Sequence, residues 1–545
     1  MPHDVATASA SAPVVDLDEL PFEHRFTQLP ADPDDANRPR QVRGAAFSRV
    51  APSSVAAPVT VAWSPEVAAL LGLSPEVCRS DDFAMVFSGG RVPRGADPHA
   101  ARYGGHQFGS WAGQLGDGRA ISLGEVRDVH GGHQALQLKG AGRTPYSRGA
   151  DGRAVLRSSV REFLCSEAMH HLGIPTTRAL SLVATGDAVV RDVLYDGHPR
   201  PEPGAVVCRV APHFLRFGSF QLPASAGELE LLRALVSFAV RSDVPHLLDE
   251  GLAPDELVAA WYEEVARRSA ALVVDWMRVG FVHGVLNTDN LSVAGLTIDY
   301  GPYGWLEGFD PEWTPNTTDA GTRRYRYGAQ PAVVQWNLQQ LGNALARLVE
   351  DAAGLQVGLD GYARHYSAGF AAMLATRLGW GIPREGDDAL VEELFATLVR
   401  TETDQVRFHR DLARVPVDPD GHLDDEQLLA PLRDAFYRPE ELVGDVRAAF
   451  VQWLRAWGGR VVAGGLGDAE RRAAMDAVNP RFVLRNWMAQ EAIDAAEQGD
   501  GGLVVELLDV LRRPYDEQPG RERWAERRPE WARVRVGCSM LSCSS

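Results

Sequence analysis

The sequence predicts an α+β protein with two lobes, a small β-rich N-lobe followed by a larger helical C-lobe, and with extensions at both ends. Short apolar strands at 120–126 and 136–139 precede the first long amphipathic helix, at 153–172. Long amphipathic helices then dominate, with the clearest patterns at 254–280 and 331–349. This order indicates that a sheet forms early in the chain and that helices build most of the remaining core.

Length and composition restrict the class of protein. The chain has 545 residues, 45% of them apolar, which is enough for roughly two to four domains. Its net charge of −18 argues against a nucleic-acid-binding protein, which usually carries a basic face. No apolar run is long enough to span a membrane, and the N-terminus lacks the basic start of a signal peptide. Five scattered cysteines do not form a disulfide framework, so we expect a cytoplasmic enzyme, with a monomer favoured.

Changes in composition and pattern divide the chain into five predicted segments. Residues 1–21 are expected to be a disordered N-terminal arm, and residues 22–100 an N-terminal extension. The N-lobe is predicted at 101–225 and the helical C-lobe at 226–500. Residues 501–545 are expected to be a C-terminal tail that ends Cys-Ser-Ser.

Lys139, in the strand that begins at Leu136, is the only lysine in the chain. The other 54 basic residues are arginine, which suggests that lysine was lost wherever arginine could replace it. A lysine is a compact point charge and an arginine is a wide planar fork, so the two are not interchangeable in a tight site. A phosphate-binding site beside a glycine-rich loop is such a place. We therefore predict a functional role for Lys139.

Two features flank Lys139 and support a nucleotide site. Gly116-Asp-Gly-Arg119 is a glycine-bearing turn about twenty residues earlier, and glycines let the backbone approach a phosphate closely. Glu162 lies in the helix at 153–172, beside its apolar stripe. A lysine on a strand paired with a glutamate on the next helix is the ion pair of protein kinases. Strands at 179–184 and 205–210 follow, which completes the order of elements in a kinase small lobe.

The segment from His283 to Gly301 carries a second kinase-like pattern. In kinases the catalytic loop reads His-Arg-Asp, four residues, Asn, and then Asp-Phe-Gly after a short hairpin. His283 and Asn290 fit the His and the metal-binding Asn, and Asp299-Tyr-Gly301 fits Asp-Phe-Gly. The position of the kinase catalytic base holds Val285, which cannot accept a proton. Asp289, next to Asn290, is the nearby carboxylate. The tetrapeptide His409-Arg-Asp-Leu412 is rejected as a second match, because Pro416 stands where Asn is required.

These motifs and their flanking residues resemble the selenoprotein O (YdiU) family of protein adenylyltransferases, which have a pseudokinase fold. The matching blocks cover much of the chain, and the likeness extends over roughly residues 22–545. The most specific blocks are Gly-His-Gln-Phe-Gly at 105–109, Leu-Lys-Gly-Ala-Gly-Arg-Thr-Pro-Tyr-Ser-Arg at 138–148, Gly-Leu-Thr-Ile-Asp-Tyr-Gly-Pro-Tyr-Gly at 295–304 and Asn-Pro-Arg-Phe-Val-Leu-Arg-Asn at 479–486.

The resemblance implies roles for individual residues. It implies that ATP is bound by Gly116, Gly118, Arg119, Lys139, Asp151, Gly152, Arg209, Arg216 and Asp299. Asn290 and Asp299 would hold Mg²⁺, with Mn²⁺ as the alternative ion, and Asp289 would accept the proton. The implied partners are ATP and proteins with hydroxyl side chains. ATP would lie flipped relative to kinases, so that its α-phosphate faces the acceptor, and this orientation accounts for Val285.

One departure from the family concerns redox control. Family members can carry a cysteine in the loop after the Asp-Phe-Gly position, where it pairs with a C-terminal cysteine. Residues 312–319 contain no cysteine, so a switch of this kind through Cys543 is not expected. Cys538 is another partner by proximity in sequence alone.

Two other functions stay open at this point. The first is a conventional kinase with Asp289 as its base, which Val285 disfavours. The second is an inactive pseudokinase scaffold that binds nucleotide, which the presence together of Lys139, Glu162, Asn290 and Asp299 disfavours. The sequence does not identify the target proteins or the acceptor residue.

Overall fold

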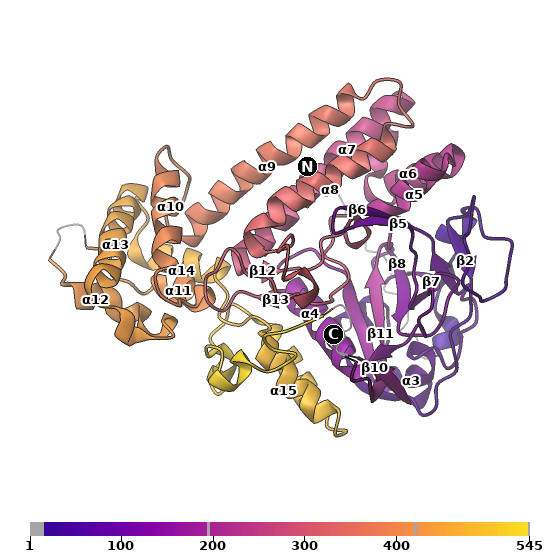
Figure 1. Ribbon diagram of the computed structural model, residues 1–545, viewed down its shortest axis with the longest axis horizontal. Coiled ribbons are helices and arrows are strands. Elements are labelled where there is room, and N and C mark those ends of the chain that lie inside the picture. Colours follow the sequence, from indigo (N-terminus) through magenta and orange to yellow (C-terminus); the bar gives the residue numbers. More distant parts are fainter. Residues whose placement is uncertain (1–15, 193–196, 419–421, 543–545) are drawn as a thin grey trace, which may run out of the picture.

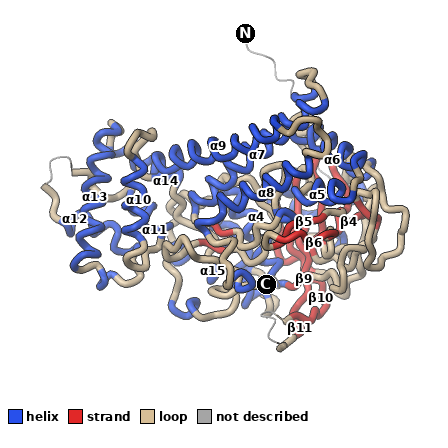
Figure 2. Tube along the Cα trace, turned by 45° about the horizontal axis from the view of Figure 1, so that its top comes forward, coloured by secondary structure: helices blue, strands red, loops and turns tan. Residues whose placement is uncertain are grey.

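A computed structural model describes residues 16–192, 197–418 and 422–542 of the chain (Figure 1). The sheet lies at one end of the molecule, the long helices α7, α8 and α9 run along one side, and α10–α14 gather at the opposite end. Figure 2 shows the same division, with the strands on one side of the long helices. None of the helices in these three ranges is long and apolar enough to cross a membrane.

Within the described residues, nine strands form one sheet in which each pairing is antiparallel. The order is β2-β4-β7-β8-β11-β10-β3, while β1 pairs with β7 and β9 pairs with β11. Two small two-stranded sheets accompany it, β5 with β6 and β12 with β13. The bounds are β1 (Phe22–Glu23), β2 (Phe47–Arg49), β3 (Val59–Trp63), β4 (His99–Ala101), β5 (Gly104–Gln107), β6 (Ser110–Gln114), β7 (Ala120–Arg127), β8 (His133–Lys139), β9 (Ala154–Val155), β10 (Arg178–Arg191), β11 (Arg200–Ala211), β12 (Phe281–Val282) and β13 (Gly304–Trp305).

Helices cover the sheet and build the rest of the protein. Local sequence sets several of their ends: Ser64, Ser74 and Ser80 each cap a short helix by accepting a backbone N–H. The bounds are α1 (Pro65–Leu70), α2 (Pro75–Cys78), α3 (Asp81–Phe87), α4 (Leu156–His171), α5 (Phe217–Ala226), α6 (Leu229–Asp243), α7 (Pro254–Val279), α8 (Gln330–Leu345), α9 (Ala353–Arg377), α10 (Asp387–Leu398), α11 (Gln405–Leu412), α12 (Asp425–Leu429), α13 (Gly444–Gly464), α14 (Asp468–Val478), α15 (Asn486–Ala496) and α16 (Gly502–Leu511).

The two faces of the sheet pack against different cores. Leu136 and Leu138 of β8 belong to a core formed with α1–α3 and the N-terminal residues. Helix α4 packs on β10 and β11 from the other side, within a larger core that continues into the helical part. Because side chains alternate along a strand, Gln137 and Lys139 point away from the leucines. Alternation therefore places Lys139 on the same side of the sheet as α4.

The N-terminal segments contribute strands to the main sheet and side chains to its core. The predicted extension at 22–100 supplies β1–β4, so it joins the main sheet. Of the arm predicted to be disordered at 1–21, residues 1–15 lie outside the described residues, and the rest is ordered. Leu17 and Leu20 are buried in the core beside α3, and Asp18 accepts a bond from Arg91. Burial of these two leucines stabilises a segment whose composition had suggested disorder.

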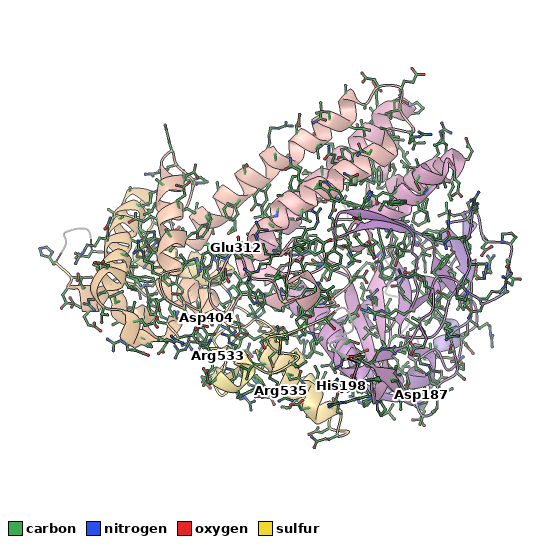
Figure 3. All side chains as sticks on the ribbon, viewed as in Figure 1. Asp187, His198, Glu312, Asp404, Arg533 and Arg535 are labelled. Atoms are coloured by element: carbon green, nitrogen blue, oxygen red, sulfur yellow. The ribbon has the colours of Figure 1, made fainter. Side chains whose placement is uncertain are left out.

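The described part of the predicted tail, residues 501–542, is also packed against the protein. Helix α16 lies against α4 and α15, and Arg533, labelled in Figure 3, forms an ion pair with Glu402 at 2.9 Å. Near its end, the carbonyl oxygen of Leu541 accepts a hydrogen bond of 2.8 Å from the backbone N–H of Thr317. The C-terminal residues therefore hold the loop that follows Gly301.

Three of the predicted elements have ends that differ from their predicted bounds. The helix predicted at 153–172 begins at Leu156, because Ala154 and Val155 form β9 and pair with β11. The strands predicted at 179–184 and 205–210 extend into the long hairpin of β10 and β11. The helix predicted at 254–280 is confirmed as α7, which ends at Val279 and is followed by Gly280 in the left-handed conformation that glycine favours.

Candidate functional site

An open cleft of about 1860 Å³, including its mouth, lies beside the end of β8. Apart from Glu162, all of the predicted site residues line it, although they come from distant parts of the sequence. Glu162 lies behind the cleft and is 1% exposed. The residues brought together are Gly116, Gly118, Arg119, Lys139, Asp151, Gly152, Arg209, Arg216, Asp289, Asn290 and Asp299.

The predicted ion pair between Lys139 and Glu162 is present. Lys139 ends β8, Glu162 lies in the buried face of α4, and the ammonium group of the lysine contacts Oε2 of the glutamate. Arg209 of β11 donates from Nε to the other oxygen, Oε1. Arg209 is the direct cross-strand neighbour of Gln137, and its Nη1 donates to the Gln137 side chain at 3.1 Å. Glu162 therefore holds two cations at the back of the cleft.

Burial and neighbouring charges lower the pKa values of both Lys139 and Glu162. Burial lowers the pKa of Lys139 to about 8, against the opposing effect of Glu162. Burial alone would raise the pKa of Glu162, but the charges of Arg209 and Lys139 outweigh it and lower that pKa. Glu162 is therefore ionised at neutral pH, and Lys139 is the member of the pair that can lose its charge in mildly alkaline solution.

Asp299 is bound by two arginines from different elements. Its Oδ1 accepts from Nη2 of Arg209 at 2.8 Å, and its Oδ2 contacts Nη1 of Arg216, which precedes α5. The backbone of Asp299 has φ +59°, a left-handed conformation that is uncommon for aspartate and concentrated at functional sites. Burial would raise its pKa, but Arg216 and Arg209 hold the pKa well below its usual range. Asp299 thus presents a fixed negative charge to the cleft.

The catalytic-loop motif forms a tight, buried segment. Nε2 of His283 donates to the carbonyl oxygen of Ile298 at 2.9 Å, which ties the start of the segment to the residue before Asp299. Nδ2 of Asn290 donates to the carbonyl oxygen of Val285 at 2.9 Å. Asp289 is 7% exposed, and burial raises its pKa to about 6 although a hydrogen bond from Gln107 opposes the shift. Asp289 is therefore a carboxylate with a pKa suited to accepting a proton near neutral pH.

The glycine turn is folded against residues 144–147. Gly116 has φ +115°, and a Cβ there would lie 2.5 Å from the ring of Tyr146. A Cβ at Gly118 would lie 3.0 Å from the Tyr146 carbonyl oxygen. Thr144 donates to the carbonyl oxygen of Asp117 at 2.7 Å. The turn thus requires glycine for its own packing, and Arg119 beside it is exposed at the cleft.

Asp151 and Gly152 form a second turn at the cleft. The carboxylate of Asp151 accepts two bonds from Arg191, at 2.7 and 2.8 Å. Gly152 has φ +71°, and a Cβ there would lie 2.1 Å from the carbonyl oxygen of Gly142. These contacts connect the loop after Lys139 to the β10–β11 hairpin.

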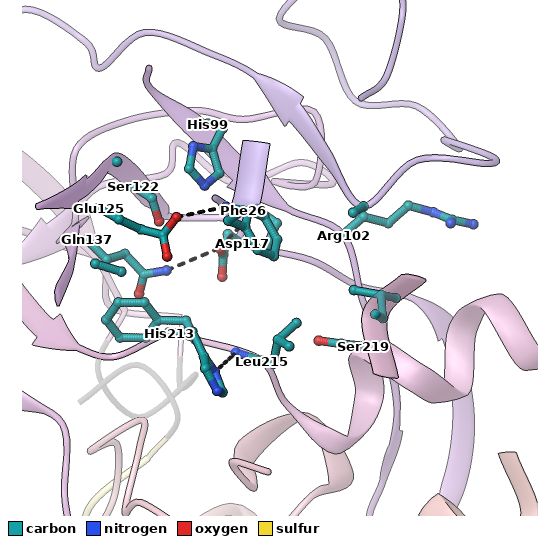
Figure 4. Close-up of a pocket in the computed structure, with 16 residues that line it drawn as sticks. Phe26, His99, Arg102, Asp117, Ser122, Glu125, Gln137, His213, Leu215 and Ser219 are labelled. Carbon is teal, nitrogen blue, oxygen red and sulfur yellow. Dashed lines mark hydrogen bonds between the residues drawn. The ribbon is translucent and has the colours of Figure 1, made fainter. Parts of the chain in front are cut away.

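Several residues of the site have no local sequence signal. Asp117 is buried, its Oδ2 accepts from Gln137 at 3.2 Å, and burial raises its pKa. Its Oδ1 lies 3.8 Å from Arg216. Figure 4 shows that Asp117, which lines the cleft, also lines a second, narrow cavity together with Gln137 and His213. Gln107 and Phe108 reach the cleft from the β5–β6 hairpin, more than 170 residues before Asp289.

The residues expected to hold a metal have suitable donor atoms. Because Nδ2 of Asn290 is engaged by Val285, the free ligand atom of this side chain is the oxygen Oδ1. Asp299 adds an ionised carboxylate whose oxygens each retain a lone pair beside their arginine. Oxygen ligands of this type suit Mg²⁺. A separate cluster of Glu66, Glu167 and His171 lies on α1 and α4, where Glu167 is already bonded to an arginine and a serine.

Of the two C-terminal cysteines, the structure describes Cys538. Cys538 is buried, and its carbonyl oxygen accepts from the side chain of Asn486 at 2.9 Å. Burial raises the pKa of the Cys538 thiol to about 12, so little thiolate forms at neutral pH. Cys543 lies outside the described residues.

Comparisons with known proteins find relatives along nearly the whole chain. Residues 39–512 match the family model described as "Protein adenylyltransferase SelO". Similar proteins named "Protein nucleotidyltransferase YdiU" include one from Azoarcus sp. strain BH72, which is 57% identical over 96% of this chain and 99% of its own length. Another, from Aromatoleum aromaticum, is 56% identical over 97% of this chain and its full length. A third, from Rhodopirellula baltica, is 56% identical over 97% of this chain and 99% of its own length.

Proposed function

This chain belongs to the SelO family of protein adenylyltransferases and is a nucleotidyltransferase, and from this membership we propose that its cleft transfers AMP from ATP to serine, threonine or tyrosine hydroxyls of target proteins. The observation that carries the proposal is the convergence of Lys139, Asp289, Asn290 and Asp299 on one cleft, with Val285 in the position of a kinase base. A kinase-like division into an N-lobe and a C-lobe is part of the same proposal.

The triphosphate would bind at the cationic end of the cleft. Lys139, Arg209 and Arg216 line the cleft and are nine-tenths or more buried, where a charge acts more strongly than in water. Each already contacts a carboxylate, so nucleotide phosphates would share or replace those partners. The glycine turn at Gly116–Gly118, Arg119 and the turn at Asp151 and Gly152 would bind the rest of the nucleotide.

In the proposed reaction the acceptor hydroxyl gives its proton to the carboxylate of Asp289. The hydroxyl oxygen forms a bond to the α-phosphorus of ATP, and the bond between that phosphorus and the bridging oxygen of the β-phosphate breaks. Pyrophosphate leaves. The raised pKa of Asp289, about 6, supports its role as the base. Fixed cations near the phosphates stabilise the charge that develops in the transition state.

Asn290 and Asp299 would hold a Mg²⁺ ion, with Mn²⁺ as the alternative. When bound, such an ion neutralises phosphate charge during transfer. The contact of Asp299 with Arg209 and Arg216 keeps its carboxylate ionised and oriented before the ion arrives.

The orientation of ATP distinguishes this proposal from a conventional kinase. A kinase presents the γ-phosphate to a base two residues after the histidine, and here that residue is Val285. With the nucleotide flipped, the α-phosphate faces the acceptor and Asp289 takes the proton. A cytoplasmic location completes the proposal, because the scattered cysteines suit a reducing compartment.

The test uses the purified full chain, Mg²⁺ and casein, a flexible protein rich in serine and threonine. One reaction contains ATP labelled at the α-phosphate and the other contains ATP labelled at the γ-phosphate, each with an Asp299→Ala control. We expect label on protein from the α position alone, and no label with the control. Label from the γ position alone would establish a conventional kinase. Nucleotide binding without labelling of casein or of the enzyme itself would favour a pseudokinase scaffold.

A further inference from the structure

The β5–β6 hairpin packs directly on the catalytic segment. Three consecutive hairpin residues bond three consecutive residues of that segment. The backbone N–H of His106 donates to Oγ1 of Thr288 at 2.7 Å. Nε2 of Gln107 donates to Oδ2 of Asp289 at 3.2 Å. The backbone N–H of Phe108 donates to Oδ1 of Asn287 at 3.1 Å.

The backbone of the hairpin is shaped for this close approach. A Cβ at Gly105 would lie 2.5 Å from Oδ1 of Asp289, so only glycine leaves room for that carboxylate. Phe108 and Gly109, at the turn, have φ of +50° and +85°, the left-handed pair of a type I′ turn. Phenylalanine is unfavourable there, and such strain persists where surrounding contacts over-determine the conformation. The N–H of Phe108 supplies such contacts, since it also reaches Oη of Tyr325 at 2.9 Å.

The two carboxylate oxygens of Asp289 make different contacts with the hairpin. Oδ1 is buried beside Gly105 and has no hydrogen-bond partner among the described residues. Oδ2 is held by the amide of Gln107. A carboxylate oxygen has two lone pairs, so Gln107 occupies one of them and the other remains available. Gln107 and Asp289 both line the cleft, and because Oδ1 is buried, Oδ2 is the oxygen left to face an acceptor group.

We infer that Gln107 is a positioning residue for AMP transfer, whose amide holds Oδ2 of Asp289 in place to receive the proton of the acceptor hydroxyl. This inference rests on the proposed function. The amide donates one hydrogen bond and takes no part in the bond changes. The hydroxyl proton moves to Oδ2 of Asp289 while the hydroxyl oxygen bonds to the α-phosphorus and pyrophosphate leaves.

A glutamine suits this task because it is neutral and carries a donor. A cationic donor would bind Asp289 strongly and compete with the acceptor hydroxyl, and a carboxylate at this position would repel it. Aromatic side chains lie beside it on the hairpin: Phe108 is 39% exposed and Trp111 is 40% exposed. The hairpin that holds the carboxylate of Asp289 thus also exposes aromatic side chains beside it.

The test compares Gln107→Met with the wild type in the transfer of α-labelled AMP to casein. Methionine has a similar length and lacks the amide. We expect kcat to fall about 10- to 100-fold, the usual effect of removing a residue that orients a reacting group, while KM for ATP changes less than about twofold. Gln107→Glu places a carboxylate beside Asp289 and should lower kcat further. If Gln107→Met has a melting temperature far below that of the wild type, the kcat of Gln107→Glu tests the role of the amide instead.

A matched control separates this role from a general need for the hairpin. Gln114 lies on β6, where its side chain bonds Arg40 and Val42 and does not contact Asp289. Gln114→Met should leave kcat within about twofold of the wild type. In an Asp289→Asn background, Gln107→Met should have little further effect on transfer, because a residue that acts through Asp289 loses its influence when that carboxylate is absent.

Three results would overturn the inference: wild-type kcat in both Gln107 variants, an equal loss in Gln114→Met, or an undiminished effect of Gln107→Met in the Asp289→Asn background. A failure of the proposed function would give a different result from a failure of this inference. In that case the wild type itself transfers no α-label, whereas the failure of this inference leaves wild-type transfer intact.

Discussion

Lys139 and Glu162 form an ion pair between the end of β8 and the buried face of α4, and Arg209 binds the second oxygen of the same carboxylate. One glutamate therefore fixes two cations that line the cleft. Because the three side chains are almost fully buried, the loss of Glu162 would leave the ammonium group of Lys139 without its carboxylate partner in a medium of low polarity. This arrangement makes the identity of residue 139 a sharp test of the site.

Lys139→Arg keeps the charge and changes its shape. We expect kcat/KM for ATP to fall about 10²-fold, since a planar fork cannot occupy the space of an ammonium group between Glu162 and the cleft. The measurement is the rate of α-label transfer as a function of ATP concentration. Arg127→Lys, at an exposed ion pair with Glu23, is the matched control and should retain wild-type activity. Equal activity of Lys139→Arg and the wild type would contradict a specific role for the lysine.

The pKa of Lys139, about 8, predicts an alkaline limit to activity. Below this pKa the side chain is protonated and can bind phosphate, and above it the charge is lost. We therefore expect kcat/KM for ATP, which reports the free enzyme, to fall as pH rises through about 8. In Lys139→Arg the remaining activity should lack this limit, because arginine stays charged. An alkaline limit that persists unchanged in the variant would assign it to another group.

Asn290→Ala removes one proposed oxygen ligand and leaves Asp299 in place. We expect the Mg²⁺ concentration for half-maximal transfer to rise about 10-fold or more, as is common when a residue that supports a metal site is lost. The measurement is the transfer rate across a MgCl₂ series at saturating ATP. Asn343→Ala, on the exposed side of α8, provides the control. A variant with a wild-type Mg²⁺ requirement would show that Asn290 does not hold the ion.

A comparison of Gly116→Ala with Gly113→Ala separates the effect of backbone strain on stability from an effect on ATP binding. Both glycines have positive φ, so each substitution should lower stability by about 1 kcal/mol. The new methyl group meets the Tyr146 ring at position 116, whereas nothing lies within 4 Å of it at position 113. We expect Gly116→Ala alone to weaken ATP binding, measured by calorimetry, with melting temperature as the stability reference. Equal ATP affinity in both variants would exclude the turn from the nucleotide site.

The sequence predicted the parts of the site that have a local pattern. Lys139 was identified by its uniqueness and by its strand, and Glu162 by its place in the next helix. Asn290 and Asp299 were identified because their spacing from His283 follows a known motif. The structure brings Lys139, Asn290 and Asp299 to one cleft, with Glu162 directly behind it. Their chemical roles stay predictions.

Contacts between distant segments could not be predicted in the same way. Gln107 meets Asp289 across 182 residues, and no periodicity links the two. The strand β1 has only two residues, too few to show alternation, and it exists because β7 offers a partner. Leu17 and Leu20 did indicate an ordered segment, since two leucines three residues apart suit one buried face of a helical turn. The small residues before them dominated the composition, and the segment was therefore predicted to be disordered.

The hydrogen bond between Leu541 and Thr317 joins two segments that lie 224 residues apart in the sequence. Because a contact between distant segments forms only when the intervening chain has folded, the loop after Gly301 depends for this partner on the helical part that lies between them. A destabilising change in that helical part would therefore loosen the loop after Gly301 without altering any residue of the site.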